Sequence, residues 1–263
     1  MPDEKQIQCD KCKTSISEME FLKSLKVCPH CNYHHQRGYY LTAFERLNLL
    51  VDEGTFLEYD ANLYSLNPLN FPEYEEKLVS DINKTGLKSE MLTGEALIGG
   101  YRTAIGIGDP NIRMGSTGAV IGEKITRLIE RAIEKRLPLI IVSPFGGGMR
   151  MQEGTISLMQ MAKTAAACAR YIEAGLFYIS VLTHVTMGGN AASFASLGHV
   201  IIAEPGTIYG FAGDRTRSSI GMEMPPEVQT AEYQLEYGMI DMIVQRKDMR
   251  ATLIDLLDFC SEE

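Results

Sequence analysis

The chain has 263 residues, of which 45% are hydrophobic and 22% are charged, and its formal net charge is −9. This composition is ordinary for a globular enzyme with a substantial core, and no stretch approaches the roughly 20 apolar residues of a membrane-spanning helix. Nucleic-acid-binding proteins usually carry a basic patch and a high isoelectric point, whereas the isoelectric point here is about 5.2. Nucleic-acid and membrane partners are therefore disfavoured. The polar N-terminus, which lacks an apolar signal core, predicts a cytoplasmic location.

Four of the six cysteines form two matched pairs, Cys9-x2-Cys12 and Cys28-x2-Cys31. Each pair places two thiolates on one tight turn, and two such turns close a tetrahedral four-sulfur site that suits zinc. A redox pair or a disulfide framework is the alternative, but matched pairs in a cytosolic chain disfavour both. A segment of about 30 residues buries too little apolar surface to fold alone, so the metal would be structural. The sequence predicts a zinc ribbon over residues 1–38.

After the ribbon, the pattern predicts a helix, a connection and a hairpin. Residues Tyr39–Asp52 have apolar side chains at helical spacing. Residues 57–90 are polar and contain prolines, which predicts loop and helix. Gly94–Ile98 and Arg102–Ile107 predict two strands joined at the glycine pair 99–100. The main domain would cover residues 39–263, with residues 39–90 as its linking helix and loop.

The rest of the chain alternates between the two kinds of element. Helices are predicted at residues 115–136, 151–174, 191–197 and 249–260, and strands at 139–143, 177–183, 200–203 and 207–211. Repetition of strand, glycine turn and helix is typical of an α/β fold with parallel strand pairing. Cys168 and Cys260 fall in apolar helical segments, which predicts buried core thiols.

Two glycine turns that open predicted helices are candidate sites of chemistry. They are SPFGGGMRMQE at residues 143–153 and THVTMGGNAAS at residues 183–193. Glycine lets the backbone approach a ligand closely, and N–H groups at a helix start point toward negative charge. Two such turns could form two oxyanion holes for an enolate-like or carboxylate-like oxygen. The alternative is that each is a tight strand-to-helix turn without a ligand.

Other signals leave more than one interpretation open. RMGSTGAVIGEK at residues 113–124 could cradle a phosphate or an adenine, although it matches neither the P-loop nor the dinucleotide fingerprint. His184 and His199 are either acid–base groups or simply hydrogen-bonded residues. Six cations recur at helical spacing and form either a solvated helix face or a surface for an anionic cofactor or partner: Arg113, Lys124, Arg127, Arg131, Lys135 and Arg136.

The order of motifs along the chain carries a resemblance to a known family. After the cysteine pairs come GGxRMQE with SLMQMAKT, then TMGG..ASFA, IAEP, GFAG and IDMIV. From about Cys9 to Arg250 this order closely resembles the beta subunits of bacterial and plastid acetyl-CoA carboxylase carboxyltransferases.

The resemblance implies an α/β fold of the crotonase-like (ClpP/crotonase) type, a ββα superhelix. It also implies a carboxyltransferase alpha subunit as partner in an α2β2 heterotetramer, and a biotin carboxyl carrier protein. The reaction would move a carboxyl group from carboxybiotin to acetyl-CoA and form malonyl-CoA, with both oxygens held by backbone amides. The implied catalytic positions are Gly147, Gly148, Gly188 and Gly189. The implied cofactor-binding positions are Arg113, Met114, Gly115, Ser116, Thr117 and Gly118 along the CoA, and Phe211, Ala212 and Gly213 facing biotin.

The chain departs from the family pattern near these candidates. The usual SxSGGAR-type loop is here SPFGGGMR at residues 143–150, and TDPTMGG is THVTMGG at residues 183–189. MGGSMG becomes MGSTG at residues 114–118, and PRVIEQT is replaced at residues 214–219. A kept core with a rewritten pocket suits a specialised paralogue. Two alternatives stay open: a biotin-independent malonyl-thioester decarboxylase in which His184 protonates the enolate, and a non-catalytic assembly subunit.

Overall fold

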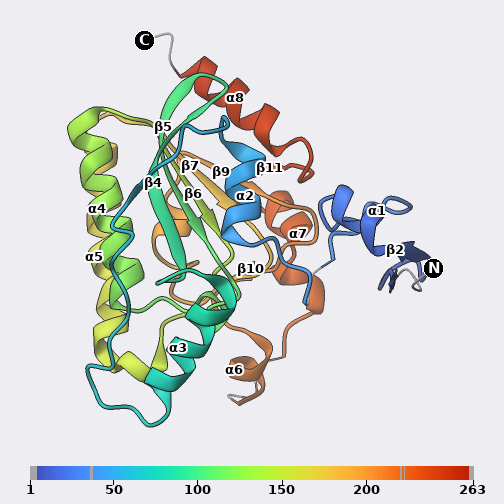
Figure 1. Cartoon of the computed structure of the whole chain (residues 1–263), viewed down its shortest axis with the longest axis horizontal. Coiled ribbons are helices and arrows are strands. Elements are labelled where there is room, and N and C mark those ends of the chain that lie inside the picture. Colours follow the sequence, from blue (N-terminus) through green and yellow to red (C-terminus); the bar gives the residue numbers. More distant parts are fainter. Residues whose placement is uncertain (1–4, 36–37, 220, 222, 261–263) are drawn as a thin grey trace.

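The computed structural model describes residues 5–35, 38–219, 221 and 223–260. A small N-terminal unit lies beside a larger α/β body (Figure 1). No helix within these described ranges is both long and apolar enough to cross a membrane.

The N-terminal unit is built from two short strands and one helix. Strands β1 (Gln6–Gln8) and β2 (Ser15–Ser17) pair antiparallel, and α1 (Glu18–Lys23) follows at once. The Ser17 side chain caps α1 by accepting the Glu20 N–H. The unit has a core of its own, made of Ile7, Cys9, Ile16, Phe21 and Cys28. This separate core supports a domain division close to residue 38, which stays a prediction.

A seven-stranded sheet forms the centre of the body, in the order β11-β9-β7-β6-β5-β4-β3. Strands β5, β6, β7, β9 and β11 pair in parallel, whereas β3 and β4 join antiparallel. Every residue of β6 and β7 is buried, as expected for strands covered on both faces. The bounds are β3 Leu57–Tyr59, β4 Met91–Ile98, β5 Tyr101–Gly108, β6 Leu139–Ser143, β7 Tyr178–Leu182, β9 Val200–Ala203 and β11 Met242–Ile243.

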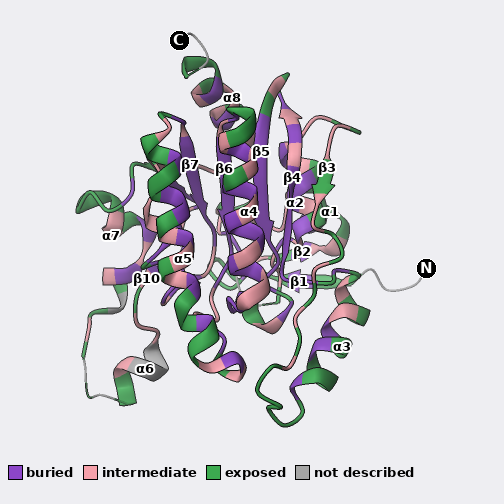
Figure 2. Cartoon of the chain, turned by 90° about the vertical axis from the view of Figure 1, so that its left-hand side faces the viewer, coloured by how far each residue is buried: buried purple, intermediate pink, exposed green. Residues whose placement is uncertain are grey.

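Helices cover both faces of this sheet (Figures 1 and 2). Helices α4 (Ala119–Lys135) and α5 (Gly154–Glu173) lie together on one face. Their buried side chains pack against the sheet in one hydrophobic cluster, which includes Leu128, Ile141 and Tyr171. Helices α2 (Ala43–Leu50) and α8 (Met249–Phe259) cover the other face, where a second hydrophobic cluster includes Leu47, Ile140 and Leu253. Thr42 begins α2 with a capping box to Glu45.

Most predicted elements are confirmed with shifted ends. The strand at Leu139–Ser143 and the glycine-linked hairpin of β4 and β5 are present, and the long helices begin a few residues later than predicted. The strand predicted at 207–211 shrinks to β10 (Tyr209–Gly210), which pairs with β8 (Thr186–Met187) in a small parallel sheet. The sequence did not indicate β3, α6 (Asp214–Ser219), α7 (Ala231–Glu236) or β11.

Two predictions are wrong. Residues 191–197 form no α-helix, only a 3-10 turn at Phe194–Ser196, because Ser193 takes a non-helical backbone (φ −129°, ψ −121°) and its hydroxyl donates to the Gly189 carbonyl. Cys260 is exposed at the end of α8, whereas Cys168 is buried as predicted.

Candidate active site and metal centre

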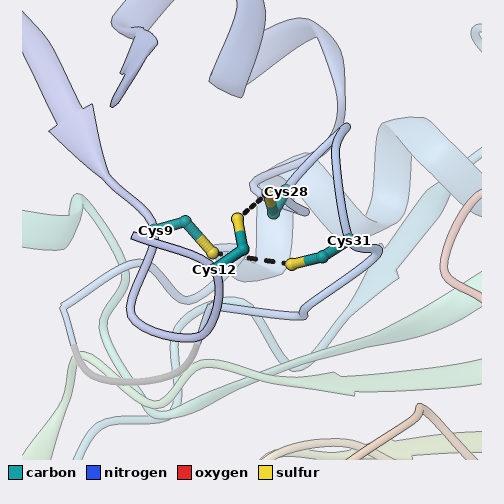
Figure 3. Close-up of side chains that lie close together, drawn as sticks. All are labelled: Cys9, Cys12, Cys28 and Cys31. Atoms are coloured by element: carbon teal, nitrogen blue, oxygen red, sulfur yellow. Dashed lines mark hydrogen bonds between the residues drawn. The ribbon is translucent and has the colours of Figure 1, made fainter. Parts of the chain in front are cut away.

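The four N-terminal cysteines converge on one point (Figure 3). Cys9 and Cys31 Sγ atoms lie 3.7 Å apart, as do those of Cys12 and Cys28, and all four sulfurs lie within 4.8 Å of one another. Zinc bonds to sulfur at about 2.3 Å in a tetrahedron, which requires sulfurs about 3.8 Å apart. The donor set and its spacing therefore fit one metal ion.

The thiols of this cluster have unequal proton affinities. Contact with the Thr14 side chain and backbone lowers the pKa of Cys12 to about 6, whereas burial raises the pKa of Cys28 to about 12. Because thiolates are the species that bind zinc, a metal ion would compete with protons for the buried sulfurs of this cluster.

A buried group of charged residues around Glu204 lies where the ribbon meets the body, and Lys26 and His34 of the ribbon also bond to Glu45 and Gln245 of the body. Glu204, which follows β9, pairs with Arg46 of α2 at 2.7 Å and with Arg246 at 2.7 Å. Arg246 also donates to the Leu25 carbonyl in the ribbon at 2.6 Å, and His34 lies 3.7 Å from Glu204. Burial alone would raise the pKa of Glu204, but the two guanidinium groups hold that pKa well below its ordinary value.

The two glycine turns predicted from sequence lie against each other. Residues 146–148 follow β6 and residues 188–189 follow β8. A Cβ atom added to Gly188 would lie 3.2 Å from the Gly148 Cα atom. Gly148 and Gly188 have φ values of +61° and +64°, which favour glycine.

The four predicted glycines differ in what their N–H groups do. The Gly147 N–H donates to the Met114 carbonyl at 2.8 Å, and the Gly188 N–H donates to the Gly210 carbonyl at 3.0 Å. Within the described part of the chain, the N–H groups of Gly148 and Gly189 donate to no other residue. These two are the donors that the turns can offer to a ligand.

The segment at residues 113–118 packs directly onto the first turn. Arg113 and Met114 have positive φ values, and the Arg113 guanidinium is bound by Asp81 of α3 (Tyr74–Thr85). Thr117 donates its N–H to the Gly148 carbonyl at 2.8 Å and accepts the Arg150 N–H at 2.9 Å. The predicted CoA-side residues and the first pair of predicted catalytic glycines therefore form one structural unit.

The predicted biotin-side residues lie beside the second turn. The Phe211 carbonyl is 3.7 Å from a Cβ position on Gly188, and the Ala212 carbonyl accepts from Gln229 at 3.0 Å. The Phe211 side chain is 70% exposed.

A cavity of about 390 Å³ opens next to both turns. Gly146 and Met187 line it from the two turns, and His184 lines it with its ring stacked 6.4 Å from that of Tyr40. Gly213 and Met114, from the two predicted binding segments, also line it. The residues that line the cavity are Tyr40, Pro110, Met114, Pro144, Gly146, His184, Val185, Met187, Ile208, Gly213 and Gln229. This lining contains no serine, cysteine, lysine or carboxylate side chain.

A fully buried arginine, two residues after the first turn, binds the 113–118 segment and α3. Arg150 donates to the Ser116 hydroxyl at 3.1 Å and to the Tyr74 hydroxyl at 3.0 Å, and it pairs with Glu90. Glu153 accepts the Ala119 N–H at 2.6 Å and so caps α4, whose N-cap Gly118 has no side chain. Arg150 and Glu153 belong to the GGxRMQE motif, but the motif does not indicate these contacts because their partners lie far along the chain.

The cations predicted on one helix are mostly neutralised. Arg127 and Arg131 both pair with Asp60, and Lys135 pairs with Glu95 at 3.0 Å. Lys124 is buried and donates to the Met91 carbonyl at 2.7 Å. The structure favours the ordinary helix face over an anion-binding surface.

Comparisons with known proteins agree with this arrangement. A model of the carboxyl transferase domain family matches residues 33–229. The acetyl-coenzyme A carboxylase carboxyl transferase subunit beta of Desulforamulus reducens is 49% identical over 258 residues, which are 98% of this chain and 88% of that protein.

Solved structures show the same fold. Transcarboxylase 12S, with methylmalonyl-coenzyme A and methylmalonic acid bound, has a TM-score of 0.72 at 23% identity over 83% of this chain, which spans 41% of the 12S chain. A Pseudomonas malonate decarboxylase hetero-tetramer in complex with malonate has a TM-score of 0.67 at 18% identity, covering 83% of this chain and 82% of that one. The crotonase-like fold is confirmed. The chain belongs to the carboxyl transferase domain family, among the beta subunits of acetyl-CoA carboxylase carboxyl transferase.

Proposed function

We propose that this carboxyltransferase beta subunit binds the acetyl-CoA thioester so that its oxygen accepts hydrogen bonds from Gly148 and Gly189. The observation that carries this proposal is the pair of N–H groups on adjoining glycine turns that donate to no described residue. Donors fixed in advance around a developing oxyanion stabilise it without reorganisation. Gly147 and Gly188, whose N–H groups are engaged by Met114 and Gly210, shape the turns.

The transfer then requires no nucleophile from this chain, in keeping with the side chains that line the cavity. When the carrier delivers it, carboxybiotin supplies the carboxyl group, and the ureido nitrogen it leaves takes the proton from the acetyl methyl carbon. The N–C bond to the carboxyl group breaks and a C–C bond to the methyl carbon forms, giving malonyl-CoA. The role of this chain is to lower the free energy of enolate formation and to hold the enolate beside residues 211–213.

Zinc, the partners and the location belong to the same proposal. Cys9, Cys12, Cys28 and Cys31 would hold a structural zinc ion. A carboxyltransferase alpha subunit would cover apolar side chains exposed near the turns, including Met114 and Met151, each 72% exposed. The complex would be an α2β2 heterotetramer served by a biotin carboxyl carrier protein in the cytoplasm.

The test is malonyl-CoA turnover by this chain purified with its native partners, followed by mass spectrometry with and without biocytin. We expect malonyl-CoA to disappear only when biocytin is present, which is the transfer run in reverse. The absence of turnover in a complex that still binds CoA would instead assign a non-catalytic assembly role.

His184 supports one alternative, a biotin-independent malonyl-thioester decarboxylase. Its ring lines the cavity beside the turns, where an imidazolium could protonate the enolate carbon. Under this alternative malonyl-CoA would be lost without biocytin, and His184→Ala would abolish that loss. An unchanged rate in His184→Ala would remove the histidine from the mechanism.

A further inference from the structure

Asn190 lies where three chain segments of the site meet. It directly follows the second glycine turn, and its side chain is fully buried. Its Oδ1 accepts from the Thr117 hydroxyl at 2.6 Å, and its Nδ2 donates to the Phe145 carbonyl at 3.2 Å and to the Gly148 carbonyl at 3.3 Å. The amide therefore joins the 113–118 segment, the first turn and the second turn.

The chemistry of the contacts fixes the orientation of this amide. Reversing it would aim Oδ1 at two carbonyl oxygens, which cannot donate. Both Nδ2 hydrogens and Oδ1 are used as the amide stands, so one rotamer satisfies every group. A fully satisfied buried polar group holds its neighbours in one arrangement.

The bonds bear on the peptide that carries the proposed donor. The Gly147 N–H is tied to the Met114 carbonyl at 2.8 Å, and the Gly148 carbonyl is tied to Asn190 and to the Thr117 N–H. The peptide group between Gly147 and Gly148, which contains the free N–H, is thus held on both sides. Asn190 itself is joined by its backbone to Gly189, which carries the other free N–H.

We propose that Asn190, oriented by the Thr117 hydroxyl, is a positioning residue that sets the two oxyanion donors, Gly148 N–H and Gly189 N–H, relative to each other. This inference rests on the proposed carboxyl-transfer function. Asn190 touches no reacting atom and acts through the backbone of the two turns.

A hydroxyl deletion tests the pair without removing backbone contacts. In Thr117→Val the Thr117 N–H still reaches Gly148, and the Phe145 carbonyl keeps the Met187 N–H at 3.1 Å, so the fold should persist. The matched control is Thr164→Val, because Thr164 is equally buried and its hydroxyl donates to the Gln160 carbonyl within α5 at 2.8 Å, away from the turns. Thr117→Ser keeps a hydroxyl and serves as the conservative variant.

In the assembled complex, Thr117→Val should lower kcat about 10- to 100-fold, because small displacements of catalytic donors are costly. KM for malonyl-CoA should change less than about twofold, since the donors act on the transition state. Thr117→Ser should restore kcat, and Thr164→Val should leave it unchanged. Equal kcat values in Thr117→Val and Thr164→Val would overturn the inference, as would a loss that Thr117→Ser fails to restore.

Hydrogen exchange gives a readout that does not depend on activity. Backbone amides at residues 145–150 and 187–191 should exchange faster in Thr117→Val than in wild type, and at the wild-type rate in Thr164→Val. If the wild-type complex transfers no carboxyl group, the proposed function fails, and this exchange comparison alone decides the positioning role. Unchanged exchange in Thr117→Val would then reject it.

Discussion

The ribbon and the glycine-turn site achieve order in different ways. The ribbon has a small core, two of whose members, Cys9 and Cys28, are themselves metal-ligand candidates, so the side chains that pack this core are also placed to bind an ion. The glycine-turn site is made of backbone, and buried polar side chains bind the segments around it: Asn190 binds the Gly148 carbonyl and Arg150 binds the Ser116 hydroxyl. A side-chain site can be recognised by residue type and spacing. A backbone site can be recognised only by which N–H groups remain without an acceptor.

Metal removal should show the largest difference between the two regions. Chelation should unfold the ribbon and leave the main sheet folded, because a structural zinc site contributes about 10 kcal/mol or more to folding. Elemental analysis should find one zinc per chain, and hydrogen exchange should accelerate at residues 5–35 after chelation. Cys28→Ser should lose the metal, whereas Cys260→Ser should keep it because Cys260 lies outside the cluster. Unchanged exchange at residues 5–35 would show that the ribbon does not depend on metal.

Glu204→Gln should give the next largest effect, because it leaves the buried Arg46 and Arg246 without their shared carboxylate. Breaking a buried ion pair costs about 3–5 kcal/mol. Denaturant unfolding would measure this loss. The matched control is Glu130→Gln on the surface, where the partner Arg170 is half exposed, and the cost should stay below about 1 kcal/mol. If both variants lost the same free energy of unfolding, the ion pairs of Glu204 where the ribbon meets the body would stabilise the fold no more than a surface pair does.

Gly147→Ala should damage the site more than the fold. An added Cβ would lie 2.9 Å from the Ser116 N atom and 3.0 Å from the Arg113 carbonyl oxygen, so the first turn must move. We expect kcat to fall by about 100-fold. Gly175→Ala, at a turn with φ +69° and open space around it, should cost about 1–2 kcal/mol of stability and leave kcat alone. If kcat survived in Gly147→Ala, the first turn would not be part of the catalytic site.

The Glu204 pKa makes the ribbon junction sensitive to acid. The pKa of Glu204 is lower in the folded state than in the unfolded state. The ionised carboxylate therefore stabilises the folded state fully at pH values above the unfolded pKa. This contribution is lost as the pH falls through the folded pKa. The stability gap between wild type and Glu204→Gln should therefore narrow below about pH 4, by about 1.4 kcal/mol per pH unit. Unfolding free energies measured from pH 7 to pH 3 test this, and a gap that does not change with pH would contradict it.

Arg127→Ala should have the smallest effect. Arg127 is 41% exposed and shares Asp60 with Arg131, so its loss should cost less than about 1 kcal/mol. KM for malonyl-CoA should not change if α4 presents an ordinary solvated face. A large increase in KM would revive the alternative of an anion-binding surface.

The clustering of the four cysteines and the outline of the fold could be predicted because their signals are local. Two cysteine pairs fix a ligand set, and glycine turns between apolar segments mark β6 with α5 and the β4–β5 hairpin. Helix 191–197 could not be rejected locally, since Ser193 leaves the helical region through a bond to the turn before it. Local sequence could not tell which glycine N–H groups are engaged, because their acceptors lie far along the chain: the Gly147 N–H donates to Met114 and the Gly188 N–H donates to Gly210. Asn190 and Thr117 stand 73 residues apart and follow no spacing rule.

The Glu204 carboxylate also has a consequence for the history and engineering of the chain. Arg246 donates hydrogen bonds both to this carboxylate and to the Leu25 carbonyl of the ribbon. A different ribbon could therefore not replace this one without loss of that contact. If a descendant lost the ribbon, the Arg246 guanidinium would lose the Leu25 carbonyl as its hydrogen-bond acceptor, and the surface that contacts the ribbon would be exposed. A chimera that receives a foreign ribbon must supply a carbonyl at the same place. The ribbon and Arg246 should therefore be inherited together, whereas Glu204 also pairs with Arg46 of the body.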